Sequence, residues 1–117
     1  MPSTTITVGA PVATLINVFT VRPERQRELA DLLATATEEV IQHLPAFVAA
    51  NIHVSADGAR VVNYAQWETA EALQAMLENP EAKEHIDRSA EVVSIPASTM
   101  SCRSITADRV GRRAGPW

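Results

Sequence analysis

Apolar residues recur with two different periods along the chain, and each period predicts a different kind of element. The run ATLINVFTV, residues 13–21, is β-branched and apolar between two prolines, which is typical of a central strand. Apolar residues then recur at helical spacing: Leu29, Leu32, Leu33, Ala36, Val40 and Leu44. This stripe predicts an amphipathic helix of about five turns that begins near Pro23 and ends before Pro45.

The second half of the chain predicts a hairpin, a broken helix and a last strand. The segment FVAANIHVSADGARVVNYAQW, residues 47–67, contains two strand-like runs around Asp57-Gly58, a strong hairpin signal. Thr69 is expected to cap a second helix, which Asn79-Pro80 interrupts before a helical piece at 81–90. The last strand is expected within 92–105.

The predicted order of elements is strand, helix, strand, strand, helix, strand. Four strands with the helices on one face make an α+β, ferredoxin-like βαββαβ sandwich. The other face of the sheet then presents Ile16, Val18 and Val62 to solvent. An apolar patch of this kind usually marks an interface, so we expect a homodimer packed sheet to sheet.

Composition and charge are those of an ordinary globular domain. The 117 residues are 46% hydrophobic and 21% charged, and the net charge of −4 offers no general attraction for nucleic acid or an anionic membrane. The single cysteine, Cys102, excludes an intramolecular disulfide, and without a signal peptide or membrane span a cytoplasmic location is expected. We expect a flexible lead at 1–11, one domain at 12–106 and a flexible basic tail at 107–117.

The chain lacks the common cofactor and nucleophile motifs. It has no GxGxxG after a strand, no P-loop and no GxSxG elbow. Its histidines, His43, His53 and His85, are far apart in the sequence and form no ligand pair on one helix or strand. No metal site is therefore expected.

Polar side chains on the strands are the remaining candidates for chemistry. In VVNYAQW, residues 61–67, Asn63 and Trp67 share one face, which is unusual for a half-buried strand. Every second residue gives three candidate inward-facing sets: Leu15, Asn17 and Phe19; Phe47, Ala49, Asn51 and His53; Val61, Asn63, Ala65 and Trp67. If all three face the helices, they line an aliphatic cavity with a few polar groups, as in a small-molecule pocket. Buried unpaired amides cost about 1–3 kcal/mol each, so several in one small core favour a functional reason.

The hairpin turn decides whether these faces merge, and the sequence leaves two registers open. A two-residue turn at the Asp57-Gly58 pair places His53 and Asn63 on opposite faces. A turn in which Gly58 forms a left-handed bulge pairs Asn51 with Asn63 and brings the faces together.

Three segments of the chain resemble the antibiotic biosynthesis monooxygenases: INVFTVRPERQRELADLL, HLPAFVAANIHVSADGARVVNYAQWETAEAL and ENPEAKEH, within residues 14–89. The most specific element, HxSxDGxxVVNYAQWE, resembles the quinone-forming branch from actinorhodin-type aromatic polyketide pathways. The resemblance implies a dimeric ferredoxin-like α+β barrel that oxidises a phenolic, anthrone-like tricyclic polyketide to a quinone with O₂. It also implies that no metal, flavin or haem cofactor is needed.

Carried over by motif, the resemblance implies that Asn63, Trp67 and His53 are catalytic, and it favours the register that places all three on one face. The expected substrate contacts are Asn17, Phe19, Asn51, Leu73, Met76 and His85. The chemistry of the catalytic residue types fits the implied role. An asparagine can donate its amide N–H to a developing oxyanion, a histidine can accept a phenol's proton, and a tryptophan can stack on the ring.

Two positions depart from the quinone-forming branch, because Leu73 and Ile86 stand where it has a tyrosine and an arginine. Arg88 or His85 is placed to substitute in part for the arginine. Two alternatives with the same fold are a cofactor-free isomerase or cyclase and a dimer that only binds a ligand. Haem degradation fits less well, since the haem-degrading branch has a tryptophan at the position of Met76.

Overall fold

The computed structural model describes residues 3–7 and 9–102, with side chains through residue 94. In chain order its elements are β1 (Ala13–Thr20), η1 (Pro23–Arg25), α1 (Gln26–Glu39), η2 (Ile41–His43), β2 (Phe47–Val54), β3 (Arg60–Trp67), α2 (Ala70–Glu78), α3 (Pro80–Ala90) and β4 (Ile95–Cys102). The predicted order of strands and helices is therefore confirmed.

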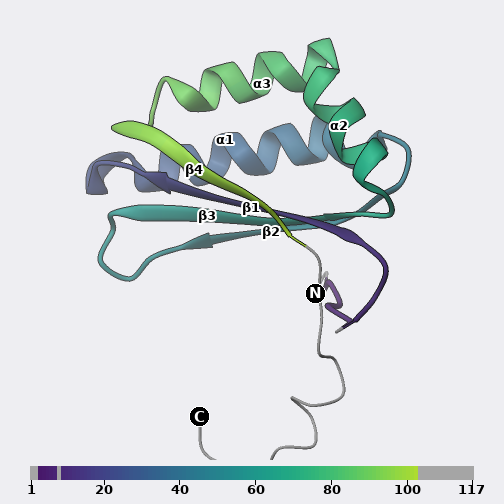
Figure 1. The fold of residues 1–117 in the computed structure, drawn as a ribbon. Coiled ribbons are helices and arrows are strands. Elements are labelled where there is room, and N and C mark those ends of the chain that lie inside the picture. Colours follow the sequence, from purple (N-terminus) through teal and green to yellow (C-terminus); the bar gives the residue numbers. More distant parts are fainter. Residues whose placement is uncertain (1–2, 8, 103–117) are drawn as a thin grey trace, which may run out of the picture.

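The strands form one antiparallel sheet of 4 strands in the order β2-β3-β1-β4. Strand β1 pairs with both β3 and β4, so the apolar run at 13–21 is central in the sheet, as predicted. Helices α1, α2 and α3 cover one face, and no helix within residues 3–7 and 9–102 covers the other (Figure 1). This arrangement is the ferredoxin-like α+β sandwich expected from the sequence.

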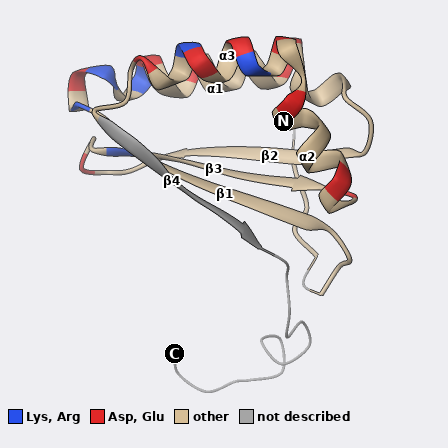
Figure 2. Ribbon diagram, turned by 45° about the horizontal axis from the view of Figure 1, so that its top comes forward, with Lys and Arg blue, Asp and Glu red and all other residues tan. Residues whose placement is uncertain are grey.

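The helices are amphipathic, and their Lys, Arg, Asp and Glu residues are exposed. Most of the Lys, Arg, Asp and Glu residues in Figure 2 lie on the helices, and few lie on the strands. In α1, the buried residues are Leu29, Ala30 and Ala36, which belong to or flank the predicted apolar stripe. Burial of this stripe against the sheet drives the packing of the two layers. No helix among residues 3–7 and 9–102 is long and apolar enough to span a membrane.

The first helix is shorter than the stripe predicted. Pro23 begins a 3₁₀ turn rather than the α-helix itself, and α1 ends at Glu39 because Val40 leaves helical geometry with φ −126° and ψ −60°. At its start, the Gln26 side-chain amide donates to two carbonyl oxygens of the β2–β3 loop region, those of Ser55 and Arg60, both at 2.9 Å. The helix is thereby tied to the hairpin by side-chain hydrogen bonds as well as by apolar contact.

The hairpin loop spans residues 56–59 and is closed by a hydrogen bond from the Ser55 N–H to the Arg60 carbonyl, 3.0 Å long. Gly58 has a φ of 80°, so its predicted positive φ is confirmed. Its N–H donates to the Ser55 carbonyl at 3.1 Å. The hydroxyl of Ser55, and then the backbone N–H of Ala59, hold the pKa of Asp57 below its usual range by donating to the carboxylate.

This loop sets a register that corrects the candidate site. Ile52 pairs with Asn63 and His53 pairs with Val62, so the prediction that His53 and Asn63 face the same cavity is wrong. Side chains alternate strictly along a strand, and the register therefore places His53 on the face away from the helices. Asn51, two residues earlier in β2, lies on that outer face as well.

A β-bulge at Val48 explains why the β2 residues do not share one face. Phe47 pairs with Trp67, whereas Ala49 pairs with the preceding residue, Gln66, so that β2 carries one extra residue between these pairs. A bulge of this kind reverses the alternation of side chains on either side of it. Phe47 consequently packs on the helix face with Trp67, and the expectation that Asn51 and His53 lie beside it was wrong.

The lead before β1 lies on the outer face of the sheet (Figure 1). The hydroxyl of Thr4 donates to Oδ1 of Asn51 across this face. Thr14 and Gln66, register partners at the same end of the sheet, are each only 2% exposed. Ile16 and other apolar residues further along this face are half-buried rather than fully exposed. The expected basic tail at 107–117 lies outside the described residues.

The predicted break of the second helix at Asn79-Pro80 is confirmed, and Asn79 caps the helix that follows. Its Oδ1 accepts from the N–H groups of Glu81 and Ala82 at 3.0 and 3.1 Å. Pro80 occupies the first helical position, where its missing N–H costs nothing. The start of α3, and with it the side chains that α3 directs toward the sheet, is therefore fixed by one side chain.

Replacing this cap is expected to destabilise the protein. Asn79→Ala removes the acceptor of both N–H groups and should lower the free energy of unfolding by about 1 kcal/mol. Asn79→Asp keeps the acceptor and should retain most of the stability. Urea unfolding followed by circular dichroism measures both, and equal stability of the alanine and aspartate variants would contradict the capping role.

Candidate active site

The helices and the sheet enclose a cavity of about 640 Å³. On the sheet it is lined by Leu15, Asn17, Phe19, Ala50, Asn63, Ala65 and Trp67. On the helices and their flanking loops it is lined by Leu33, Ala36, Thr37, Ile41, Met76, Leu77, His85, Ile86, Ser89, Ala90, Val93 and Ser94. Its volume is within the usual range for small-molecule sites, and its walls are mostly apolar.

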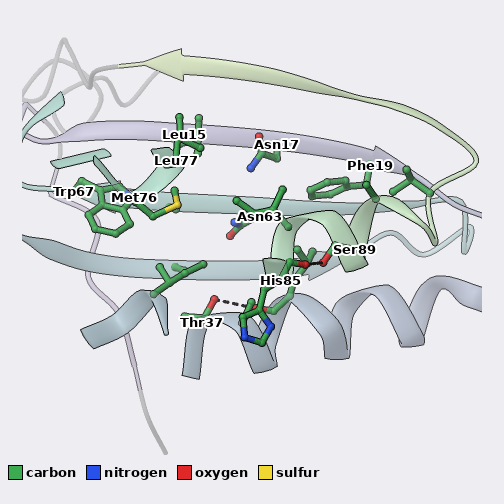
Figure 3. A pocket seen from close by; sticks show the side chains of 18 of the residues that line it. Leu15, Asn17, Phe19, Thr37, Asn63, Trp67, Met76, Leu77, His85 and Ser89 are labelled. Carbon is green, nitrogen blue, oxygen red and sulfur yellow. Dashed lines mark hydrogen bonds between the residues drawn. The ribbon is translucent and has the colours of Figure 1, made fainter. Parts of the chain in front are cut away.

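Two amides lie next to each other on the floor of the cavity. Asn17 of β1 and Asn63 of β3 are register partners, and both side chains project toward the helices (Figure 3). Oδ1 of Asn63 is buried and has no hydrogen-bond partner among the described residues. A buried acceptor of this kind costs about 1–3 kcal/mol when it stays unpaired. The cavity floor therefore includes an amide whose oxygen has no described protein partner.

Trp67 closes one end of the cavity. Its side chain is completely buried, and its ring meets the edge of Phe47 with centroids 5.2 Å apart and an interplanar angle of 81°. Met76 of α2 lies beside it (Figure 3). The indole Nε1 is buried and lacks an acceptor among the described residues. An aromatic ring with an unpaired N–H suits a flat, oxygen-bearing ligand.

His85 comes from α3, on the opposite side of the cavity from the sheet. Its side chain is 15% exposed, and its ring is directed toward α1, where Thr37 also lines the cavity (Figure 3). Nε2 of His85 lies 3.8 Å from Oε2 of Glu39, whose side chain is 63% exposed. One turn later, the Ser89 hydroxyl donates to the His85 carbonyl at 3.1 Å.

The structure brings together six of the nine residues expected at the site: Asn17, Phe19, Asn63, Trp67, Met76 and His85. His53 and Asn51 lie on the outer face, for the reason given above. Leu73 is 5% exposed and packs in the core cluster around Trp67 instead of lining the cavity. Arg88 is directed to solvent and paired with Glu84 at 3.0 Å.

Thr37 and Ser89 line the cavity but were not among the expected residues. The helical spacing of the sequence could have identified both residues. Thr37 follows Leu33 by four residues on the stripe of α1, and its hydroxyl donates to the Leu33 carbonyl at 3.0 Å. Ser89 follows His85 by four residues on α3. Residues spaced in this way lie on one face of a helix, so a polar residue on an apolar stripe marks a cavity wall.

No group of at least 3 His, Cys, Asp or Glu residues that could hold a metal ion exists within the described part of the chain. The polar atoms of the cavity are instead amides, hydroxyls, one indole and one imidazole. These groups suit an organic ligand with oxygen substituents.

Comparison with known proteins identifies the family of the chain. Residues 13–88 match the sequence profile of the family described as antibiotic biosynthesis monooxygenase. The chain belongs to this family. It is 48% identical over 83 residues to tetracenomycin-F1 monooxygenase of Streptomyces glaucescens, a match that covers 71% of this chain and 74% of that protein. As a member of the family, the protein is a monooxygenase.

Solved structures of antibiotic biosynthesis monooxygenases share the fold. The monooxygenase ActVA-Orf6 of Streptomyces coelicolor, solved in complex with nanaomycin D, superposes with a TM-score of 0.75 at 28% identity, over 81% of this chain and 88% of that one. The cofactor-independent oxygenase SnoaB of Streptomyces nogalater, solved as an asparagine-to-alanine variant, superposes with a TM-score of 0.69 at 21% identity, over 81% and 96% of the two chains.

The unpaired Asn63 acceptor predicts an unusual response to mutation. Asn63→Leu replaces a buried, unsatisfied amide by an apolar side chain of similar size, so the free energy of unfolding should stay the same or rise by up to about 1 kcal/mol. The matched control is Asn79→Ala, which removes an amide oxygen with two partners and should destabilise. Chemical unfolding measures both, and a loss of about 1–3 kcal/mol in Asn63→Leu would indicate a structural amide.

Proposed function

We propose that this monooxygenase oxidises a phenolic, anthrone-like aromatic polyketide to a quinone with O₂ and without a cofactor. The observation that carries the proposal is an apolar cavity whose sheet side holds two neighbouring amides, Asn17 and Asn63, with Trp67 at one end. The relatives support it in their own descriptions, which name a monooxygenase of tetracenomycin F1, a complex with nanaomycin D and a cofactor-independent oxygenase.

The cavity fits a flat aromatic substrate with a few oxygen atoms. Its volume of about 640 Å³ accommodates three fused rings, and its aliphatic and aromatic walls favour apolar ring surface over water. Trp67 and Phe19 lie at the two ends of the cavity (Figure 3), and Phe19 is half-buried. Only a small number of polar atoms then fix the substrate's orientation.

The reaction needs little chemistry from the protein. An electron-rich phenol or enol becomes a reductant for O₂ once it has lost its proton, and the enzyme must bind it, stabilise the anion and hold the reacting pair together. The amide N–H groups of Asn63, with Asn17 beside it, can stabilise the negative oxygen as oxyanion-hole donors do. The overall change converts a ring CH₂ and O₂ into C=O and H₂O.

Kinetics of two variants test the assignment. Asn63→Ala should lower kcat by roughly 10²–10³ with little change in KM, because the amide acts on charge that develops in the transition state. Trp67→Phe should raise KM more than it lowers kcat, since much of the stacking area remains. The measurements are O₂ uptake and product mass with a panel of anthrones, alongside melting temperature. Wild-type kcat in a normally folded Asn63→Ala variant would refute the role of the amide, and turnover without O₂ would indicate an isomerase or cyclase.

We further propose that the protein functions as a homodimer joined through the outer sheet face. Val18 and Val62 are register partners there, and together with Ile16 they form an apolar row that no helix covers. Rows of this kind in small sheet proteins are usually buried by a second copy.

Sedimentation velocity tests the dimer. The wild type should sediment as a dimer at micromolar concentration, and Val62→Arg should shift it to monomer because a charge would be buried in the interface. Val54→Arg is the matched control, since Val54 is 50% exposed and lies on the opposite face of the sheet from Val62. A monomeric wild type would refute the proposal.

A further inference from the structure

One residue stands apart among those that line the cavity. Of the described lining residues, His85 alone carries an imidazole, the side chain that most often serves as a general base; the others are aliphatic, aromatic, amide, hydroxyl or thioether. His53, the base expected from the resemblance, lies on the other face of the sheet. Any proton transfer by a described side chain inside this cavity must therefore use His85.

We propose that His85 is the general base of the oxidation and that Glu39 positions its ring, an inference that rests on the proposed function. The side chain of His85 is 15% exposed, so it is shielded by the protein yet still open to the cavity. An imidazole that lines the substrate cavity is the side-chain type most often found as a general base.

The surroundings of His85 contain one charged group directed at its ring. From α1 this is Glu39, with Oε2 at 3.8 Å from Nε2. On α3 itself, Glu84 is paired with Arg88 at 3.0 Å. The described sheet and α2 residues that line the cavity are uncharged. At this distance the carboxylate acts as a charge partner once the ring is protonated.

The proton transfers balance over one turnover. His85 takes the proton of the anthrone's enol hydroxyl, which leaves an anion conjugated to the opposite ring carbon. This anion passes one electron to O₂, and the substrate radical and superoxide combine at that carbon to form a C–O bond. The imidazolium returns its proton to the peroxide anion. His85 then accepts the proton of the same ring carbon while the O–O bond breaks, forming C=O, and the departing hydroxide takes this proton and leaves as water.

Glu39 has a smaller role because its side chain is 63% exposed. Water screens ion pairs at exposed sites, and such pairs are worth about 0.2–1 kcal/mol. A five-fold change in rate corresponds to the upper end of that range. The carboxylate holds the ring and stabilises the imidazolium, and it does not contact the substrate.

A binding experiment without turnover separates this role from the oxidation itself. The probe is 1,8-dihydroxyanthrone, mixed with protein under argon, where the anion absorbs at longer wavelength than the neutral anthrone. Wild type should produce the band of the anion, and His85→Gln, which keeps a neutral polar side chain of similar length, should not. His43→Gln is the matched control: His43 is exposed and does not line the cavity, and its Nε2 lies 3.1 Å from the Glu38 carbonyl.

Aerobic kinetics complete the test. His85→Gln should lower kcat by roughly 10²–10⁴ and remove the loss of kcat/KM at acidic pH that protonation of a base produces. Glu39→Gln should lower kcat about two- to five-fold with unchanged KM. Glu38→Gln, an exposed glutamate next to Glu39 in α1, should leave both unchanged. Melting temperatures identify any variant that has lost its fold. If His85→Gln is unfolded, His85→Ala replaces it, and added imidazole should restore the activity of His85→Ala.

The outcomes decide between the two proposals. The anion band in wild type without O₂ uptake would refute the proposed oxidation and leave the role of His85 in place. O₂ uptake at the wild-type rate in folded His85→Gln, or its loss in His53→Gln instead, would refute the role of His85 alone. A wild type with neither band nor O₂ uptake would contradict both.

Discussion

The edge-to-face contact between Phe47 and Trp67 organises the rest of the site. At this end of the hairpin, Phe47 of β2 points to the helix face of the sheet. The hairpin register places the later odd-numbered residues of β2, such as Asn51 and His53, on the outer face. The extra residue at Val48 resolves this conflict. The chain enters β2 through Ala46 with a φ of 64°, a left-handed geometry that costs an alanine about 1–2 kcal/mol. Burial of two aromatic rings offsets that cost.

The pairing of β1 with β3 then determines which polar groups reach the substrate. Because Asn17 and Asn63 are partners in this ladder, both amides project from the same point of the sheet into the cavity. Helix α3 supplies the histidine from the facing layer, at an orientation fixed by the cap at Asn79. The site therefore combines rigid groups from a sheet with one titratable group from a helix, and its geometry does not depend on a loop.

Much of this arrangement could be predicted from periodicity and turn chemistry. The strand at 13–21, the stripe on α1, Gly58 with positive φ and the break at Asn79-Pro80 each follow from local sequence. The position of His53 could not be predicted, because it depends on the length of the hairpin loop, and two registers fit the same residues. Leu73 illustrates a second limit: helical spacing places it on the inner side of α2, but packing around Trp67 decides that it fills the core and not the cavity wall.

The unpaired atoms of Asn63 and Trp67 also connect ligand supply to the lifetime of the enzyme. A molecule that satisfies them binds only the folded chain, so its concentration adds to the stability of that state by mass action. The empty protein is the least stable form, and it opens to proteases more often than the occupied one. A supply of the ligand thereby protects the folded protein, and loss of that supply shortens the lifetime of the protein.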